Sequence, residues 1–197
     1  MPKVIKNVEE KLIFAAEELF IQGDYDTVNM RKIAKHAGVA SGTVYNYFPN
    51  KEVLYQTVLM KSWNITLREL DGIRVADLTL PIKLKKFMNT LYMGVVNRKG
   101  LGGRLILEER RNGNTKVSET EDKLVSHMAY IQDHLVSMLN ESDSLVRRIP
   151  DTERLASMIV NSFWVLQKQY EGKTDENIKF IEDFLDTLIS KEDGCNE

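Results

Sequence analysis

The sequence has few cysteines, few prolines and no long apolar run. Its single cysteine, Cys195, excludes an intramolecular disulfide and a zinc site built from cysteines, and so low a content is typical of a cytoplasmic protein. No segment reaches the roughly 18 consecutive apolar residues of a membrane-spanning helix, and the first residues lack the apolar core of a signal peptide. The sequence therefore predicts neither secretion nor a membrane location.

Charge of one sign is not in excess either. The chain of 197 residues carries 27 Lys and Arg against 29 Asp and Glu, a formal net charge of -2. This balance excludes a polycation that binds nucleic acid by bulk charge alone. With 43% hydrophobic and 28% charged residues the composition is that of an ordinary globular protein. A folded chain of this length buries about 70% of its surface, so we expect a substantial core.

The spacing of apolar residues predicts an all-α fold of about nine helices with no sheet. The prolines after Pro2 fall at positions 49, 81 and 150, where they separate helical segments. The segment 72–80 is expected to be a loop. The expected helices cover about 7–23, 29–37, 41–48, 51 to the low seventies, 81–98, 103–111, 118–140, 151–170 and 174–190.

Several residues are expected to cap these helices. Asn7, with Glu10 three residues later, has the spacing of a capping box. Asn50, Ser118 and Thr174 stand at three further predicted starts, where their side chains can accept a backbone N–H.

Residues 29–48 fit a helix-turn-helix on steric grounds. Ala34 stands where two short helices would cross, and Gly38 permits the positive φ of a tight turn. Apolar side chains would hold the second helix against the first and against the preceding helix. These are Ile33, Ala37, Val39, Val44 and either Tyr47 or Phe48.

The second helix of this unit would turn short or hydrogen-bonding residues outward. Gly42 allows close backbone approach, Thr43 offers a hydroxyl and a methyl group for thymine, and Asn46 can pair bidentately with adenine. Tyr45 lies on the same side. This set is suited to base edges and phosphates, so it predicts a DNA-reading helix.

A basic cluster lies around the same helix, and the amide groups at the start of the helix after Asn50 form a natural phosphate seat. Residues 1–52 hold seven basic and seven acidic side chains. The acidic ones gather on the first helix and the turn after it, so we expect a local basic side facing DNA. The basic cluster comprises Arg31, Lys32, Lys35, His36 and Lys51.

Three runs carry a resemblance to a known family: NMRKIAKHAGV at 29–39, SGTVYNYF at 41–48 and NKE at 50–52. With the preceding helix they resemble the amino-terminal domain of tetracycline-repressor-like (TetR family) transcriptional regulators over about residues 7–66. The resemblance implies a dimer that binds a palindromic double-stranded DNA operator as a repressor and is released by a small-molecule inducer. It implies a helix-turn-helix domain at 1–50 and a ligand-binding and dimerisation domain at 51–197, joined by a helix at about 51–70.

The resemblance also implies roles for single residues. The family positions that match Ser41, Gly42, Thr43 and Asn46 face bases, and those that match Asn29, Tyr45, Tyr47 and Lys51 mostly hold phosphates. Ala40 replaces a frequent serine, and Asn46 and Tyr47 stand where histidine is common. The mode of binding is therefore implied, whereas the operator sequence is not.

A second copy of the chain is the expected partner. Two heads of a dimer read half-sites about 34 Å apart, or a small multiple of that, which gives more discrimination than one head. The helices at about 151–170 and 174–190 have wider apolar faces than one core covers, so they are the candidates for a four-helix bundle between subunits. The alternative is that these faces only close the core of one subunit.

Large apolar side chains gather in the middle of the chain, where they line a ligand pocket or simply fill the core. The family resemblance, and not their spacing, favours a pocket. A ligand that prefers one tilt of the helix at about 51–70 would change the distance between the two heads. The candidates are Trp63, Phe87, Met88, Tyr92, Phe163 and Trp164.

Catalytic, metal and cofactor motifs are missing from the sequence. His127 and His134 lie about 10 Å apart along a helix, too far to share a metal ion, so we interpret them as surface histidines. No nucleophile has a base partner nearby, and no glycine loop for phosphate occurs. The sequence therefore predicts no enzyme, no metal site and no cofactor. The main alternative to a regulator is a helical ligand-binding or scaffold protein whose head does not read DNA.

Overall fold

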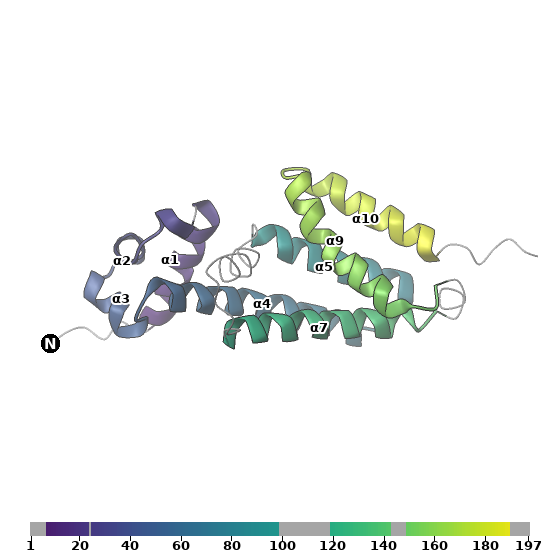
Figure 1. Ribbon diagram of the computed structural model, residues 1–197, viewed down its shortest axis with the longest axis horizontal. Helices are drawn as coiled ribbons and strands as arrows, with labels where there is room; N and C mark the ends of the chain where they lie inside the picture. Colours follow the sequence, from purple (N-terminus) through teal and green to yellow (C-terminus); the bar gives the residue numbers. More distant parts are fainter. Residues whose placement is uncertain (1–6, 24, 99–118, 143–148, 190–197) are drawn as a thin grey trace, which may run out of the picture. The chain divides into compact units, whose positions relative to one another are not determined.

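The computed structural model describes residues 7–23, 25–98, 119–142 and 149–189. These residues form eight α-helices, one short 3₁₀ helix and no strand (Figure 1), which confirms the all-α prediction. The helix expected at 103–111 and the cap expected at Ser118 lie outside the described residues. None of the described helices has both the length and the apolar character needed to cross a membrane.

The chain divides into two compact units, and the division falls inside one long helix, α4 (Lys51–Val75), between Ser62 and Trp63. The expected domains at 1–50 and 51–197 place their boundary at the start of this helix instead, and they remain a prediction. Helix α4 contributes residues to both units, so one covalent connection between them runs through this helix.

The first unit contains α1 (Val8–Gln22), a 3₁₀ turn η1 (Tyr25–Thr27), α2 (Met30–Ala37), α3 (Ser41–Tyr47) and the first half of α4. Its core includes an aromatic cluster of Phe20, Tyr25 and Tyr55, whose ring centroids lie 4.9 to 5.8 Å apart. The predicted apolar faces are buried. They include Leu12, Ala16, Phe20, Ile33 and Val44.

The second unit contains the rest of α4, α5 (Leu80–Asn97), α7 (Glu119–Leu139), α9 (Thr152–Gln169) and α10 (Thr174–Ile189). Helix α10 runs beside α5, and α7 runs beside α9 (Figure 1). Most of the apolar positions predicted for these helices are buried, whereas Met158, expected on the apolar face of α9, is 58% exposed. The buried side chains include Leu84, Phe87, Leu91, Ile131, Leu135, Ile159, Phe163, Ile181 and Leu185.

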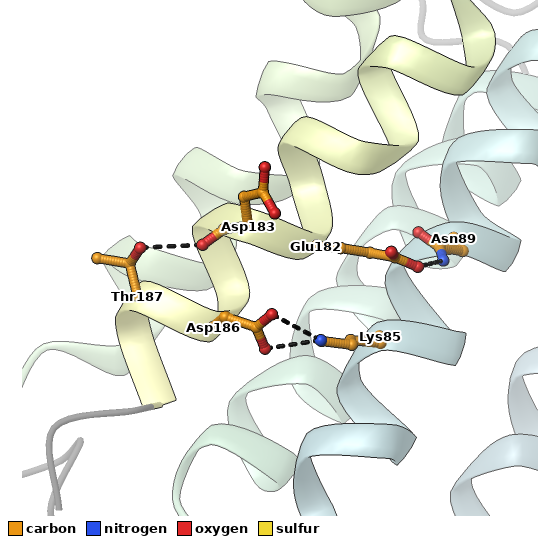
Figure 2. A network of polar contacts seen from close by, with 6 residues as sticks. All are labelled: Lys85, Asn89, Glu182, Asp183, Asp186 and Thr187. Atoms are coloured by element: carbon orange, nitrogen blue, oxygen red, sulfur yellow. Dashed lines mark hydrogen bonds and ion pairs between the residues drawn. The ribbon is translucent and has the colours of Figure 1, made fainter. Parts of the chain in front are cut away.

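Polar contacts join α5 to α10 along their exposed edge (Figure 2). The Lys85 ammonium lies 2.7 and 2.8 Å from the two carboxylate oxygens of Asp186. One turn along, the Asn89 amide donates to Glu182 over 2.7 Å. The hydrogen bond to Asp186 raises the pKa of Lys85 above its ordinary value. These contacts join the two helices at two points one turn apart.

Three of the predicted helix starts and ends need correction. Asn7 adopts a left-handed conformation with φ 73°, and its side chain accepts no capping hydrogen bond. Thr174 does not cap α10 but is its first residue, and the Lys173 carbonyl accepts the N–H of Asn177 over 2.9 Å. The loop expected at 72–80 is shorter, because α4 continues through Gly72 to Val75. A long helix tolerates one glycine at a cost of about 1 kcal/mol.

The cap expected at Asn50 is confirmed. Its side-chain oxygen accepts the N–H of Val53 over 2.8 Å at the start of α4. Asp151 does the same at the start of α9, where its carboxylate accepts the N–H of Arg154 over 3.0 Å. Both starts are therefore set by local sequence.

Candidate nucleic-acid interface

Helices α2 and α3 form the helix-turn-helix that the sequence predicts. Ala34 is buried between them, and Gly38 has the expected left-handed conformation, with φ 69°. The N–H of Val39 then donates to the Ala34 carbonyl over 2.9 Å, which closes the end of α2. The turn is therefore held by backbone bonds that a side chain at position 38 would strain.

Helix α3 has a sharply divided surface. Val44 and Phe48 point into the core, whereas Tyr45 and Tyr47 are 53% and 45% exposed. Of the two candidates for the inner position, Phe48 is thus the buried one and Tyr47 lies outward. Ser41, Gly42 and Asn46 are exposed and Thr43 is half-buried. One edge of α3 therefore presents hydroxyl, amide and glycine positions to the outside.

Packing among the described residues does not require a glycine at position 42. A Cβ atom built there would meet no atom of these residues within 4 Å, and the backbone does not have the positive φ that favours glycine. Glycine within a helix is nevertheless destabilising by about 0.5–1 kcal/mol relative to alanine. The packing of the unit thus gives no reason for a glycine here, and close approach of an external molecule does.

Asn29 and Lys32 are engaged at the start of α2. The Asn29 side-chain oxygen accepts the N–H of Lys32 over 3.0 Å, so Asn29 is the N-cap of the helix. The Lys32 ammonium donates to the Thr27 carbonyl over 2.7 Å. Both residues hold the turn before α2 in place. This hydrogen bond uses the side-chain oxygen of Asn29, and the amide nitrogen of the same side chain takes no part in it.

Lys51 makes a contact that sequence reasoning missed. Its ammonium donates to the Tyr25 carbonyl over 2.9 Å and lies 3.8 Å from the centre of the Tyr25 ring. The side chain is half-buried. It therefore joins the start of α4 to the turn η1. Residues 26 positions apart meet here, and no local pattern signals such a pair.

The basic cluster is less positive than the sequence predicts. His36 lies 2.7 Å from the Glu18 carboxylate, since α1 packs against α2, so the acidic residues of α1 are not all remote from the cluster. Lys32 and Lys51 are turned to backbone carbonyls. Arg31 and Lys35 are fully on the surface. Lys32 and Lys51 keep their positive charge, and the Glu18 carboxylate beside His36 is what lowers the net charge of the cluster.

The aromatic and methionine residues proposed for a ligand lie in the second unit. Phe87, Met88, Tyr92 and Phe163 are fully buried, and the rings of Tyr92 and Phe163 meet edge to face at 5.6 Å. Trp63 is also buried, whereas Trp164 is half-buried. These positions are those of core residues. Their contact with a ligand remains a prediction.

The interpretation of His127 and His134 as surface residues is wrong, because both are half-buried against neighbouring helices. The ring of His127 lies 6.5 Å from that of Trp63, and that of His134 lies 4.0 Å from Tyr130. Burial first, and then the charge of Arg98, lower the pKa of His127 below its ordinary value. In the described ranges no group of three or more His, Cys, Asp or Glu side chains is placed to hold a metal ion.

Comparison with known proteins bears on the same segment. The model of a family described as "Bacterial regulatory proteins, tetR family" matches residues 12–58, which contain the whole helix-turn-helix. The helix-turn-helix segment of this chain belongs to the TetR family. This is a family of helix-turn-helix transcriptional regulators and not of enzymes, as the sequence predicts.

Relatives and solved structures are similar to this chain over different lengths. The uncharacterized HTH-type transcriptional regulator YuxN of Bacillus subtilis is 25% identical over 136 residues, which are 69% of this chain and 46% of that protein. The HTH-type transcriptional repressor KstR of Mycobacterium tuberculosis is 33% identical over 89 residues, 45% of this chain and 38% of that one. The chain thus spans less than half the length of these curated relatives.

The TetR fold extends beyond the matched segment. The structure of the fatty acid degradation regulator FadR from Bacillus halodurans superposes with a TM-score of 0.66 at 19% identity, over 93% of this chain and 96% of that one. The similarity shows that the second unit shares the helical architecture of such regulators. At this identity it shows the fold alone.

Proposed function

We propose that this chain is a dimeric transcriptional regulator, and specifically a repressor, that binds a palindromic DNA operator and is released by a small-molecule inducer. The observation that carries the proposal is the edge of α3. There Gly42, which packing among the described residues does not require, lies among exposed hydrogen-bonding side chains. The naming of KstR as a repressor supports the direction of regulation.

In the proposed complex, α3 enters the major groove, which admits an α-helix and presents a distinct donor and acceptor pattern for each base pair. Ser41, Thr43 and Asn46 then reach base edges, and Gly42 lets the helix backbone come close. The exposed hydroxyl groups of Tyr45 and Tyr47 reach phosphates. Arg31 and Asn29 complete the phosphate contacts at the start of α2, Arg31 by charge and Asn29 by its amide nitrogen.

The role proposed for Lys51 takes account of its contact with Tyr25. An ammonium group has three N–H donors, and the Tyr25 carbonyl takes one of them. The other two suffice for a phosphate oxygen at the start of α4. Since the side chain is already ordered, a phosphate contact would require little further loss of side-chain entropy.

For the dimer, we propose the faces of α9 and α10. Met158 and Val165 are two turns apart on α9 and therefore on one side, and Met158 is 58% exposed. On α10, Phe180 is 59% exposed. Apolar side chains of this size on two neighbouring helices are typical of an interface, and pairing with a second copy would form a four-helix bundle.

Helix α4 offers a route from inducer to DNA. It is one continuous helix of 25 residues that contributes to both units. An inducer that favours one orientation of α4 would therefore act on both heads of the dimer. A coupling free energy of about 1–3 kcal/mol would change operator affinity about 5- to 150-fold.

A gel-shift titration tests the proposal. The purified protein is mixed with duplexes from the intergenic DNA upstream of its own gene, with random duplex as competitor. We expect one sequence to be bound preferentially, and a nuclease footprint of the bound duplex to show two protected half-sites. Failure to prefer any of these duplexes, or any sequence selected from a random pool, would refute DNA reading and leave the helical ligand-binding protein as the alternative.

A further inference from the structure

A single residue, Tyr25, holds the ammonium of Lys51 through two contacts. The ammonium donates to the Tyr25 carbonyl over 2.9 Å and lies 3.8 Å from the centre of the Tyr25 ring. Both residues belong to the first unit. The two contacts restrain a side chain whose four-carbon stem is otherwise flexible. The position of this positive charge at the start of α4 is therefore set by Tyr25.

The ring and the carbonyl of Tyr25 are themselves held in place. The ring stacks on Phe20 of α1 with 5.8 Å between centroids, and it meets Tyr55 of α4 edge to face at 4.9 Å. Phe20 and Tyr55 are each 3% exposed. The carbonyl also accepts the N–H of Val28 over 3.2 Å at the end of η1. Lys51 thus rests on groups that the core and the turn keep fixed.

Packing among the described residues of the first unit does not require a charge at position 51. The contact between the rings of Tyr25 and Tyr55 already joins η1 to α4. An apolar side chain at position 51 would cover the ring without the cost of partly desolvating an ammonium. Lys51 is half-buried, and the Tyr25 carbonyl uses only one of its three N–H donors. A charge held in this way suits an anionic partner, which in the proposed complex is a DNA phosphate.

We propose that Tyr25 is a positioning residue for DNA binding, which holds the Lys51 ammonium where it meets a phosphate. Tyr25 acts through Lys51 and does not itself touch DNA. Because the ammonium is placed before DNA arrives, binding costs less side-chain entropy than it would with a mobile lysine. The phosphate contact of Lys51 belongs to the proposed function, so this role of Tyr25 rests on it. The alternative is that the contact between Tyr25 and Lys51 only stabilises the fold of the first unit.

The salt dependence of operator affinity separates positioning from charge. Lys51→Met removes the charge but keeps a long side chain, so it should lower the affinity and reduce the slope of log affinity against log salt by about 1. Tyr25→Leu removes the ring and leaves the charge, so it should lower the affinity about 2- to 5-fold with the slope unchanged. Tyr25→Phe, which keeps the ring, should restore the affinity. A Tyr25→Leu variant with wild-type affinity would overturn the proposal.

A double-mutant cycle tests whether Tyr25 acts only through the fold. In the Lys51→Met background the ring has no ammonium to hold, so adding Tyr25→Leu should cause no further loss of operator affinity. Leu12→Val is the control, because Leu12 is buried in α1 and a small packing defect there should change the affinity by the same factor in both backgrounds. Equal losses from Tyr25→Leu in the two backgrounds would overturn the proposal. All affinities are measured where circular dichroism shows each variant to be folded.

The ring current of Tyr25 reports on the position of Lys51 without DNA. In the full chain labelled with ¹³C-lysine, the Lys51→Met variant identifies the signal of the Lys51 εCH₂ protons. We expect this signal to lie upfield of those of the other lysines, because the ammonium lies over the Tyr25 ring. Tyr25→Phe should keep the shift and Tyr25→Leu should lose it. A wild-type Lys51 signal among those of the other lysines would overturn the proposal.

The wild-type complex decides the question even if a Tyr25 variant does not fold. When an operator duplex selected from a random pool is added, the Lys51 protons should stay upfield, because the ammonium contacts the phosphate while it remains over the ring. A return to the position of the other lysines would show that Lys51 leaves Tyr25 to reach DNA, and would overturn the proposal. A protein that binds no duplex would instead refute the proposed function, and with it the role of Tyr25 in DNA binding.

Discussion

Replacing Gly42 with alanine should make the free protein more stable and its complex with DNA weaker. The new methyl group meets no atom within 4 Å in the free chain, and the φ angle suits alanine. Gly72 in α4 has the same properties, since it is exposed, lies within a helix and has open space around its Cβ position. Gly72→Ala is thus a matched control at a site away from α3.

The expected gain in stability is small but measurable. Glycine to alanine within a helix stabilises by about 0.5–1 kcal/mol, and the lower end applies at Gly42 because it lies in the first turn of α3. In a chain of this size about 1 kcal/mol shifts the melting temperature by roughly 2–4 °C. Both variants should therefore have a melting temperature roughly 1–4 °C above that of the wild type.

The expected loss in DNA affinity belongs to Gly42 alone. If the backbone of α3 lies against the duplex, a methyl group there overfills the contact, which costs about 1–3 kcal/mol or roughly 5- to 150-fold in affinity. Fluorescence anisotropy with a labelled operator duplex measures this loss, and Gly72→Ala should bind as tightly as the wild type. A Gly42→Ala protein that is more stable and binds equally well would refute the position of α3 in the groove.

Three other predictions test separate parts of the proposal. Tyr45→Ala should weaken binding to operator and random duplex alike, whereas Asn46→Ala should lose the preference between them, and competition binding that shows the reverse would exchange their roles. Light scattering should find the Val165→Glu variant monomeric. Val75→Glu, the same substitution at the exposed end of α4, should stay dimeric, and identical results for the two variants would contradict the interface. Between pH 7 and 5, urea titrations should show a smaller decrease in the free energy of unfolding for His127→Phe than for the wild type. The same decrease in both proteins would contradict a lowered pKa of His127. The pKa of His127 is lowered on folding, so the unfolded chain takes up a proton that the folded chain refuses, and stability falls as pH drops through the ordinary value of about 6.5.

Several features that depend on neighbours in sequence were predictable, although the caps expected at Asn7 and Thr174 were not found. Asn50 precedes a helix and caps it, and Gly38 ends α2 in the left-handed conformation, because both effects act within one turn of the chain. The division of α3 into an inner and an outer side follows from the helical period. There the sequence left Tyr47 and Phe48 open, since adjacent aromatic residues at the end of a short helix satisfy the period about equally.

Features that depend on tertiary contact were not predictable. Lys51 meets Tyr25 across 26 positions and His36 meets Glu18 across 18, and both pairs form because separate helices happen to pack at that point. Sequence positions alone placed Lys51 and His36 in one basic cluster. They did not show that the Glu18 carboxylate lies beside His36, so the net charge of the cluster was overestimated. His127 was wrongly expected to lie on the surface for the same reason. A histidine among polar neighbours in sequence becomes half-buried when α7 lies against Trp63 of α4.

The edge of α3 has a physical property that distinguishes it from the rest of the fold. Along the α5–α10 edge, Lys85 and Asp186 satisfy each other, and nothing outside the chain is needed to explain them. Gly42 differs, because it lowers helix stability without a packing benefit among the described residues. Departures of this kind from local consistency are expected at functional sites. In the proposed complex, the close approach of DNA would give position 42 the role that packing within the described residues does not provide.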